Sequence, residues 1–378
     1  MINLLITGDY SPQYRVSEFI AQRDFASIFG EVKSLTSQMD YSVVNFESAV
    51  ADKTDKPILK CGPNLHCDAK ALEAIKWAGF DMVTLANNHF YDYGEAGLEK
   101  SFEAIRCNWL DSVGAGRNLE EASKVFYKKI KGKVFAFINC CEHEFSIATE
   151  EHGGCNPLDS IQQYYQITDA RSKADYVIVI VHGGHEYFQL PSLRMQDTYR
   201  FFVDAGADAV VNHHQHCYSG YEFYKGKPIV YGLGNLCFDY ADEKQPDCWY
   251  EGYCLQLAVD GDEIHIKLHP YVQCKDAASI RFLVKTTTFL NDVSDLNRTI
   301  NEREELSRKI KWYYEKSIKS YLSILEPYNC NRYLRGLYTR RLLPSLLFKR
   351  RVLWPFNVLN CESHLDKLRF SLISYLKK

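Results

Sequence analysis

Five short apolar runs in the first 215 residues each end in a cluster of polar side chains. Valine, isoleucine and leucine dominate these runs, which is typical of strands covered on both faces of a sheet. The runs span residues 3–7, 41–44, 81–86, 176–181 and 209–211.

Helical periodicity separates these predicted strands. Apolar residues recur at helical spacing in residues 68–78, 95–109 and 193–205, and Gly79 and Gly206 stand where helices commonly end. Hairpin patterns follow at residues 124–138, 221–230 and 254–268. This mixture predicts an α/β protein in which two packed sheets are flanked by helices.

The C-terminal part of the chain has a different character. Residues 293–325 read as one long charged helix that Pro327 ends, so we place a domain boundary near residue 290 and expect domains at 1–290 and 291–378. Residues 331–378 contain eleven Lys and Arg residues against two acidic ones, a net charge of +9, and residues 1–330 carry −12. We therefore expect an acidic body with a basic helical appendage.

Composition narrows the class of protein. The chain has 378 residues, of which 46% are hydrophobic and 25% charged, as expected for a folded globular protein. Its 13 cysteines form no regular framework, so free thiols and a cytoplasmic location are expected. The N-terminus has no basic segment typical of a secretory signal, and no apolar run reaches 18 residues.

The polar residues at the predicted strand ends are those that bind metals. In open α/β sheets, ligands collect beyond the carboxyl ends of the strands. Carboxylates, imidazoles and an amide together suit Mn²⁺, Zn²⁺ or Fe, and the set is large enough for one or two ions. The residues are Asp9, Glu47, Asn87, Asn88, His89, His182, His214 and His216.

Six ordered motifs resemble the CapA (poly-γ-glutamate capsule synthesis protein) family, which is similar to the calcineurin-like metallophosphoesterases. The resemblance covers about residues 1–275 and implies a four-layer αββα fold with a metal centre at the strand ends. The motifs are Gly8-Asp9, Asn45-x-Glu47, Asn87-Asn88-His89-x-x-Asp92-x-Gly94, His182-x-Gly184-x-Glu186, His213-His214-x-His216 and Gly234-Asn235.

The resemblance implies a role for each matched residue. Glu47 takes the bridging position among the metal ligands, which are Asp9, Glu47, Asn88, His182, His214 and His216. His89 contacts substrate or donates a proton, and Asp92 orients it. The candidates for substrate contact are Asn87, Glu186 and Asn235.

The chain also departs from the metallophosphoesterase pattern. Ser11 stands where that pattern has a histidine two residues after the first aspartate, and Glu47 replaces the bridging aspartate. Gln215 and Asn212 replace the usual proline and glycine around the last histidines. One ligand fewer predicts one tightly and one weakly held ion.

Two functions follow as expectations. The first is a metal-dependent hydrolase of phosphoester or amide bonds in capsule or exopolymer (poly-γ-glutamate or polysaccharide) biosynthesis, acting on a polymer or on a small phosphorylated or amide substrate. The alternative is a non-catalytic or weakly catalytic component that binds a polymer or partner in a capsule-assembly complex. Tyr91, Tyr93 and Tyr187 either stack on a sugar or serve packing.

The basic tail has two interpretations as well. Arginine, leucine, phenylalanine and tryptophan mix in residues 340–356, so this segment either lies on an anionic membrane surface or packs on the acidic body. The first interpretation makes the protein peripheral to a membrane. No nucleic-acid partner is expected, because the aromatic residues do not alternate with basic ones.

Overall fold

The computed structural model describes residues 1–240, 245–347, 349–360, 364, 368 and 372. The chain divides into two units, Met1–Ser307 and Arg308–Lys378. The division falls after Ser307, whereas the sequence indicated residue 290. The difference arises because α9 (Thr287–Asn301) buries Phe289 and Val293 in the core of the first unit.

The first unit is built on two sheets. In the larger sheet, the order is β18-β17-β16-β1-β2-β5-β6, and β15 pairs with the end of β1. Strands β1, β2, β5, β6 and β15 are parallel to one another, whereas the pairs β1–β16, β16–β17 and β17–β18 are antiparallel. The bounds are β1 Ile2–Ser11, β2 Tyr41–Phe46, β5 Met82–Thr84, β6 Asp111–Val113, β15 Asn235–Phe238, β16 Glu251–Asp260, β17 Glu263–Gln273 and β18 Ile280–Phe282.

The second sheet has the order β13-β14-β12-β11-β9-β8, with β13 and β8 as antiparallel edges. The hairpins expected around residues 131, 225 and 261 are confirmed as β8–β9, β13–β14 and β16–β17. The bounds are β8 Phe126–Ile130, β9 Lys133–Cys141, β11 Tyr176–His182, β12 Ala209–His213, β13 Tyr221–Tyr224 and β14 Lys227–Val230, with the short strands β3 Ala49–Val50, β4 His66–Cys67, β7 Ala115–Gly116 and β10 Gly154–Cys155.

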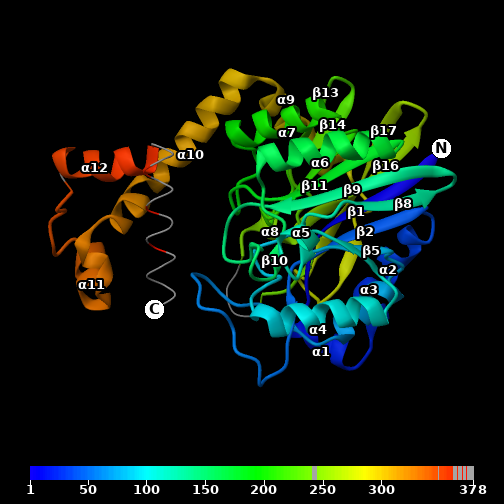
Figure 1. Cartoon of the computed structure of the whole chain (residues 1–378), viewed down its shortest axis with the longest axis horizontal. Coiled ribbons are helices and arrows are strands. Elements are labelled where there is room, and N and C mark those ends of the chain that lie inside the picture. Colours follow the sequence, from blue (N-terminus) through cyan, green and yellow to red (C-terminus); the bar gives the residue numbers. More distant parts are fainter. Residues whose placement is uncertain (241–244, 348, 361–363, 365–367, 369–371, 373–378) are drawn as a thin grey trace. The chain divides into compact units, whose positions relative to one another are not determined.

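Alternating side chains of β1 point to two different cores. Leu4 and Ile6 pack between the two sheets against Phe137 and Ile180, whereas Leu5 packs with the helices on the outer face. Figure 1 shows α6 and α7 on one side of the paired sheets and α1, α3 and α4 on the other. Besides α9 and the start of α10 (Arg303–Ile324), the helices described in the first unit are α1 Tyr14–Ala21, α2 Phe25–Thr36, α3 Lys70–Trp77, α4 Gly94–Cys107, α5 Leu119–Ala122, α6 Ser160–Lys173, α7 Leu193–Ala205 and α8 Asp247–Tyr250.

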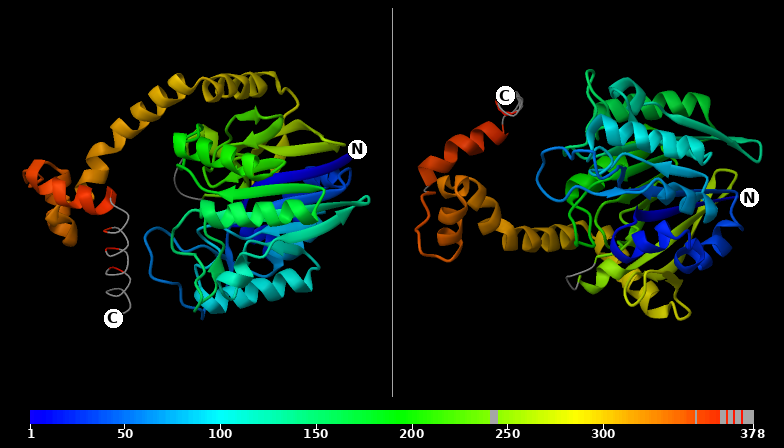
Figure 2. Two further views of the ribbon diagram at one scale, coloured as in Figure 1. Left: turned by 45° about the horizontal axis from the view of Figure 1, so that its top comes forward. Right: turned by 90° about the horizontal axis from the view of Figure 1, so that it is seen from below.

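This arrangement is the four-layer αββα sandwich that the resemblance implied. The strands of the two sheets run in similar directions (Figure 2), so the carboxyl ends of the parallel strands gather at one end of the first unit. That end carries the polar residues singled out in the sequence.

The long helix expected over residues 293–325 is instead two helices, α9 and α10 (Arg303–Ile324), separated at Glu302. Two contacts with α7 accompany the break: Gln196 Nε2 donates to Ile300 O at 2.9 Å, and Arg303 pairs with Asp197. The side chain of Gln196 therefore supplies a hydrogen-bond donor to a carbonyl group near the end of α9, where helix carbonyls lack partners within the helix.

Three short helices follow α10 in the described part of the second unit. They are η1 Pro327–Cys330, α11 Arg332–Thr339 and α12 Lys349–Asn360. In the described part of the chain, no helix is both long and apolar enough to cross a membrane. Four basic residues of the tail lie outside the described residues, namely Lys367, Arg369, Lys377 and Lys378.

Candidate metal centre

Polar side chains from both sheets converge where the parallel strands end. Asp9 lies near the end of β1, and Glu47 and Asn88 follow β2 and β5 of the larger sheet. His182 ends β11 of the second sheet, and two further histidines follow β12. All the residues expected to bind metal are buried, namely Asp9, Glu47, Asn88, His182, His214 and His216.

The first of two ligand groups consists of Glu47, His182 and His214, whose donor atoms lie within 4.8 Å of one another. His182 Nε2 lies 3.6 Å from Glu47 Oε1 and 3.1 Å from His214 Nδ1. Asn88 Oδ1 lies 3.0 Å from the same His182 nitrogen, so a fourth donor is at hand. Two imidazoles, a carboxylate and an amide oxygen make a set suited to a transition-metal ion.

The second group consists of Asp9, Glu47 and His216, which satisfy the same distance limit. His216 Nδ1 lies 3.7 Å from Asp9 Oδ2, and His216 Nε2 lies 3.9 Å from Glu47 Oε1. His216 Nδ1 also donates to Asn235 Oδ1 at 2.8 Å, which leaves Nε2 to face Glu47. Glu47 belongs to both groups, as the resemblance implied.

Glu47 provides the test of whether these residues fit a cation. Both of its carboxylate oxygens are buried, and neither has a hydrogen-bond partner. Burial, together with the nearby Asp9, raises the pKa of Glu47, because its charge has no protein partner to stabilise it. Burial lowers the pKa of His182 and of His216, which favours the neutral, metal-binding form of both rings. The residues therefore fit one or two divalent ions.

Gly8 allows the backbones of β1 and β15 to lie close together beside the cluster. A Cβ atom on Gly8 would lie 1.8 Å from the carbonyl oxygen of Gly234, so only glycine permits β15 to approach β1. This approach pairs Asp9 with Asn235. His214 and His216 have φ angles of 92° and 53°, a region that most residues avoid and that is enriched at functional sites.

His89 lies beside the first group, and its partners are fixed. His89 Nδ1 lies 2.7 Å from Asp92 Oδ2, in the arrangement expected from the sequence. The other oxygen of Asp92 forms an ion pair with Lys60, whose side chain is almost entirely buried. Lys60 Nζ also donates to Asn88 O at 3.3 Å. Asp92 thus orients His89 and holds the segment that carries Lys60.

Sequence reasoning missed Lys60 and the part played by Asn45. Lys60 lies in a segment without helix or strand, where no periodicity marks it. Asn45 Nδ2 donates to Asp9 Oδ1 at 2.7 Å and lies 3.3 Å from His182 Nδ1, so it links the two ligand groups. Its place in the motif with Glu47 was the available signal.

The three residues expected to contact substrate differ in their surroundings. Asn87 is fully buried; its Oδ1 accepts from His89 N at 3.0 Å and its Nδ2 donates to Phe46 O at 2.9 Å. Asn235 is buried against His216. Both amides therefore support neighbouring residues. Glu186 is exposed, and its negative charge adds to the effects that raise the pKa of Glu47, so its carboxylate lies near the cluster.

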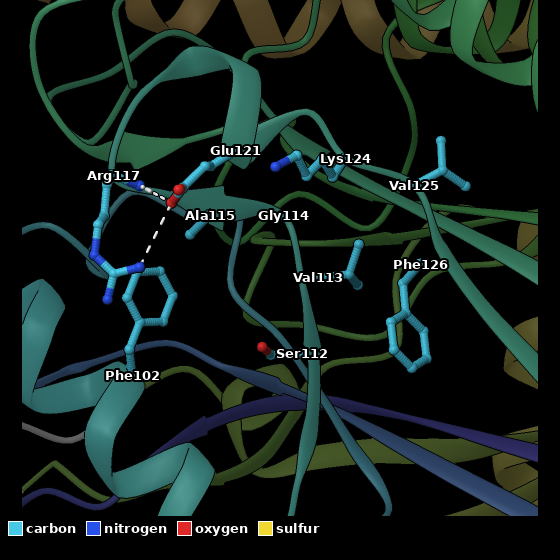
Figure 3. A pocket seen from close by; sticks show the side chains of 10 residues that line it. All are labelled: Phe102, Ser112, Val113, Gly114, Ala115, Arg117, Glu121, Lys124, Val125 and Phe126. Carbon is cyan, nitrogen blue, oxygen red and sulfur yellow. Dashed lines mark hydrogen bonds and ion pairs between the residues drawn. The ribbon is translucent and has the colours of Figure 1, made fainter.

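A separate hollow of about 400 Å³ lies between α4, β6 and the start of β8 (Figure 3). Its arginine, Arg117, is paired with Glu99 and Glu121, so the charge is already neutralised. None of its ten described lining residues is a histidine, an aspartate or a cysteine. The hollow therefore lacks the donor set of the strand-end cluster.

Comparison of the amino-acid sequence with known proteins identifies the family to which the chain belongs. The family model described as "Bacterial capsule synthesis protein PGA_cap" matches residues 3–240. "Capsule biosynthesis protein CapA" of Bacillus anthracis is 33% identical over 246 residues, which cover 63% of this chain and 60% of that protein. "PGA biosynthesis protein CapA" of Bacillus subtilis (strain 168) is 30% identical over 329 residues, covering 82% of this chain and 85% of that protein.

Solved structures show weaker similarity. A 5'-nucleotidase precursor from Thermus thermophilus is 12% identical with a TM-score of 0.43, covering 74% of this chain and 55% of that one. A hypothetical protein from the same organism is 14% identical with a TM-score of 0.46, covering 72% and 99%. The sequence comparisons decide the family: the chain belongs to the bacterial capsule synthesis protein PGA_cap family.

Proposed function

We propose that the protein is a metal-dependent hydrolase that cleaves a phosphoester or amide bond in capsule or exopolymer biosynthesis, with poly-γ-glutamate or polysaccharide as the polymer. The proposal rests on the surroundings of Glu47. Its buried carboxylate has no hydrogen-bond partner and lies between two groups of candidate metal-binding side chains. The names of the relatives, which refer to capsule and PGA biosynthesis, support the biological setting.

The residues around the cluster suit such a reaction. When bound, divalent ions polarise a phosphoryl or carbonyl oxygen and activate water. The Nδ1 proton of His89 is directed at Asp92, so when the ring is protonated on both nitrogens its Nε2 proton is free to go to the leaving group, which leaves a neutral ring. Asp92 is fully buried and keeps the ring in that orientation.

The test is turnover of chromogenic phosphodiesters and amides by metal-stripped protein resupplied with Mn²⁺, Zn²⁺ or Fe²⁺. The variant His89→Gln is expected to lose about 10²–10⁴-fold in turnover, the usual contribution of a general acid, with unchanged metal content. His265→Gln, on the exposed part of β17, is the matched control. Equal turnover by His89→Gln and the control would contradict the role of His89.

A second function is favoured by one observation. Ser11 stands where the metallophosphoesterase pattern has a histidine, which leaves the second group with three donors. Two relatives in Mycobacterium tuberculosis, 29% identical over 172 residues, are named "Probable polyglutamine synthesis accessory protein". A protein that binds metal but shows no turnover with any ion or substrate class would be a polymer-binding component of this kind.

A further inference from the structure

A row of aromatic side chains leads away from the metal-binding cluster. Trp249 is 1% exposed, and its ring lies 4.9 Å from the ring of His216. Tyr187 stacks on Trp249 at 5.8 Å and 27°, and Tyr240 meets Trp249 edge-on at 5.9 Å. Tyr14 continues the row 5.7 Å from Tyr240. Tyr187, Tyr240 and Tyr14 are 42%, 37% and 47% exposed, so the row presents ring surface to solvent beside the cluster.

Hydrogen bonds to neighbouring residues fix two members of this aromatic row, Trp249 and Tyr187. Trp249 Nε1 donates to Phe238 O at 3.1 Å, and Trp249 O accepts from Gln273 Nε2 at 3.0 Å. Tyr187 N donates at 2.8 Å to the carbonyl oxygen of Gln215, which lies between the two ligand histidines that follow β12. A ligand that stacks on Tyr187 would therefore meet a surface already ordered in the protein.

Two exposed carboxylates near the cluster indicate which class of ligand the aromatic row would bind. Glu186 is exposed, and Glu144 is 43% exposed with Oε1 4.0 Å from His214 Nε2. These carboxylates disfavour a polyanion such as a glutamate polymer or a nucleic acid, so of the two polymers named under the proposed function they favour the polysaccharide. They accept hydrogen bonds from hydroxyl groups, and the C–H face of a pyranose ring stacks on the negative face of tyrosine.

We propose that Tyr14, Tyr240 and Tyr187 form a binding subsite for a neutral sugar ring next to the metal-binding cluster. The proposal deepens the proposed function, because it places a carbohydrate beside the bond that would be cleaved. It concerns binding, however, and so can be tested without turnover.

The test is isothermal titration calorimetry of the full chain with neutral oligosaccharides, namely oligomers of glucose and of N-acetylglucosamine. Tyr187→Ala is expected to weaken binding about tenfold, as loss of a stacked ring does, whereas Tyr187→Phe keeps the affinity. Tyr165→Ala, which removes an exposed tyrosine of α6, is the matched control.

Three outcomes would overturn the proposal: no binding of any neutral oligosaccharide, equal affinity of Tyr187→Ala and the control, or preference for glutamate oligomers or nucleosides. Sugar binding without hydrolysis of any substrate would support the subsite and contradict the hydrolase. The two proposals therefore fail separately.

A different observation concerns the second unit. Residues 331–360 contain seven Lys and Arg residues and no acidic one. Helix α11 buries none of its side chains, and it exposes Tyr333 to 82% together with Arg332 and Arg335. Leu342, just beyond it, is 67% exposed. Apolar and basic side chains thus share one exposed segment.

We infer that this segment binds the surface of an anionic membrane. Basic residues are attracted to anionic lipid headgroups, and exposed tyrosine and leucine side chains enter the boundary between headgroups and acyl chains. A soluble polyanion would be held by the arginines alone and would not require the apolar residues.

Flotation of the full chain with vesicles tests this inference. Binding is expected to vesicles of phosphatidylcholine with about 30% phosphatidylglycerol and not to phosphatidylcholine alone. The double variant Tyr333→Ser, Leu342→Ser is expected to reduce the bound fraction severalfold, and the control Tyr165→Ser to leave it unchanged. Binding that survives the double variant but disappears in salt would identify a purely electrostatic, polyanion-binding segment and overturn the inference.

Discussion

The two ligand groups of the strand-end cluster share Glu47 but differ in their remaining donors. The first group adds His182, His214 and the nearby Asn88 oxygen, whereas the second adds only Asp9 and His216. Affinity for a metal ion depends on the number and type of donors that hold it. We therefore expect the cluster to bind two ions with unequal affinity, and the variants below test that expectation.

The largest effect is expected from Glu47→Gln, because Glu47 serves both groups. The variant should lose both ions and all turnover in metal analysis and activity assays. At a pH above the raised pKa of Glu47, the metal-free variant should also unfold at a higher temperature than metal-free wild type, because a buried charge without a partner has been removed. Glu120→Gln, at an exposed position, is the control. Retention of two ions by Glu47→Gln would contradict the shared position.

The next largest effects are expected from two variants that each affect only one ligand group. His214→Ala should abolish the tighter of two phases in a titration against a metal chelator and leave the weaker phase, whereas His216→Ala should do the reverse. The reason is that each histidine belongs to only one group. If both variants removed the same phase, the cluster would hold a single ion.

A smaller change is expected from Asn235→Ala. His216 would lose the acceptor that fixes its Nδ1 proton, and losses of such partners typically reduce metal affinity about 10–100-fold. Only the weaker phase should change. The control is Asn301→Ala, at an exposed position of α9. A change in the tighter phase instead would show that Asn235 does not act through His216.

The smallest expected effect is an increase in metal affinity. Ser11→His restores the imidazole of the metallophosphoesterase pattern and should strengthen the weaker phase by about tenfold, or about 1.4 kcal/mol. Ser11 is fully buried, so Ser11→Leu measures the effect of added bulk without a donor. Equal affinities of the two variants, measured by the same titration, would show that position 11 does not reach the second group.

Much of the fold was readable from local pattern. All five apolar runs are strands, and α3, α4 and α7 lie where helical spacing predicted them. Helices α1, α2 and α6 were not predicted, although α2 buries Phe25, Ile28, Phe29 and Val32 at helical spacing and Asp24 caps it. That signal was present in the sequence.

Other features required three-dimensional contacts. Lys60 reaches Asp92 from an irregular segment 32 residues away, and no spacing rule predicts such a pair. The break between α9 and α10 is accompanied by a hydrogen bond from Gln196, which lies 104 residues before Ile300 in the chain. The hydrogen bonds of Asn87 to Phe46 and of Asn235 to His216 join residues 41 and 19 positions apart, so spacing in the sequence did not predict them.

Local patterns were enough to predict which side chains stand at the strand ends, because each apolar run and the polar residues that follow it are neighbours along the chain. How these side chains combine into ligand groups depends on contacts between distant parts of the chain. Glu47 serves two groups and Asn45 links them because two separate sheets bring their strand ends together. Packing between sheets is set by long-range burial of apolar faces, and this is why distances between side chains of different strands cannot be read along one chain.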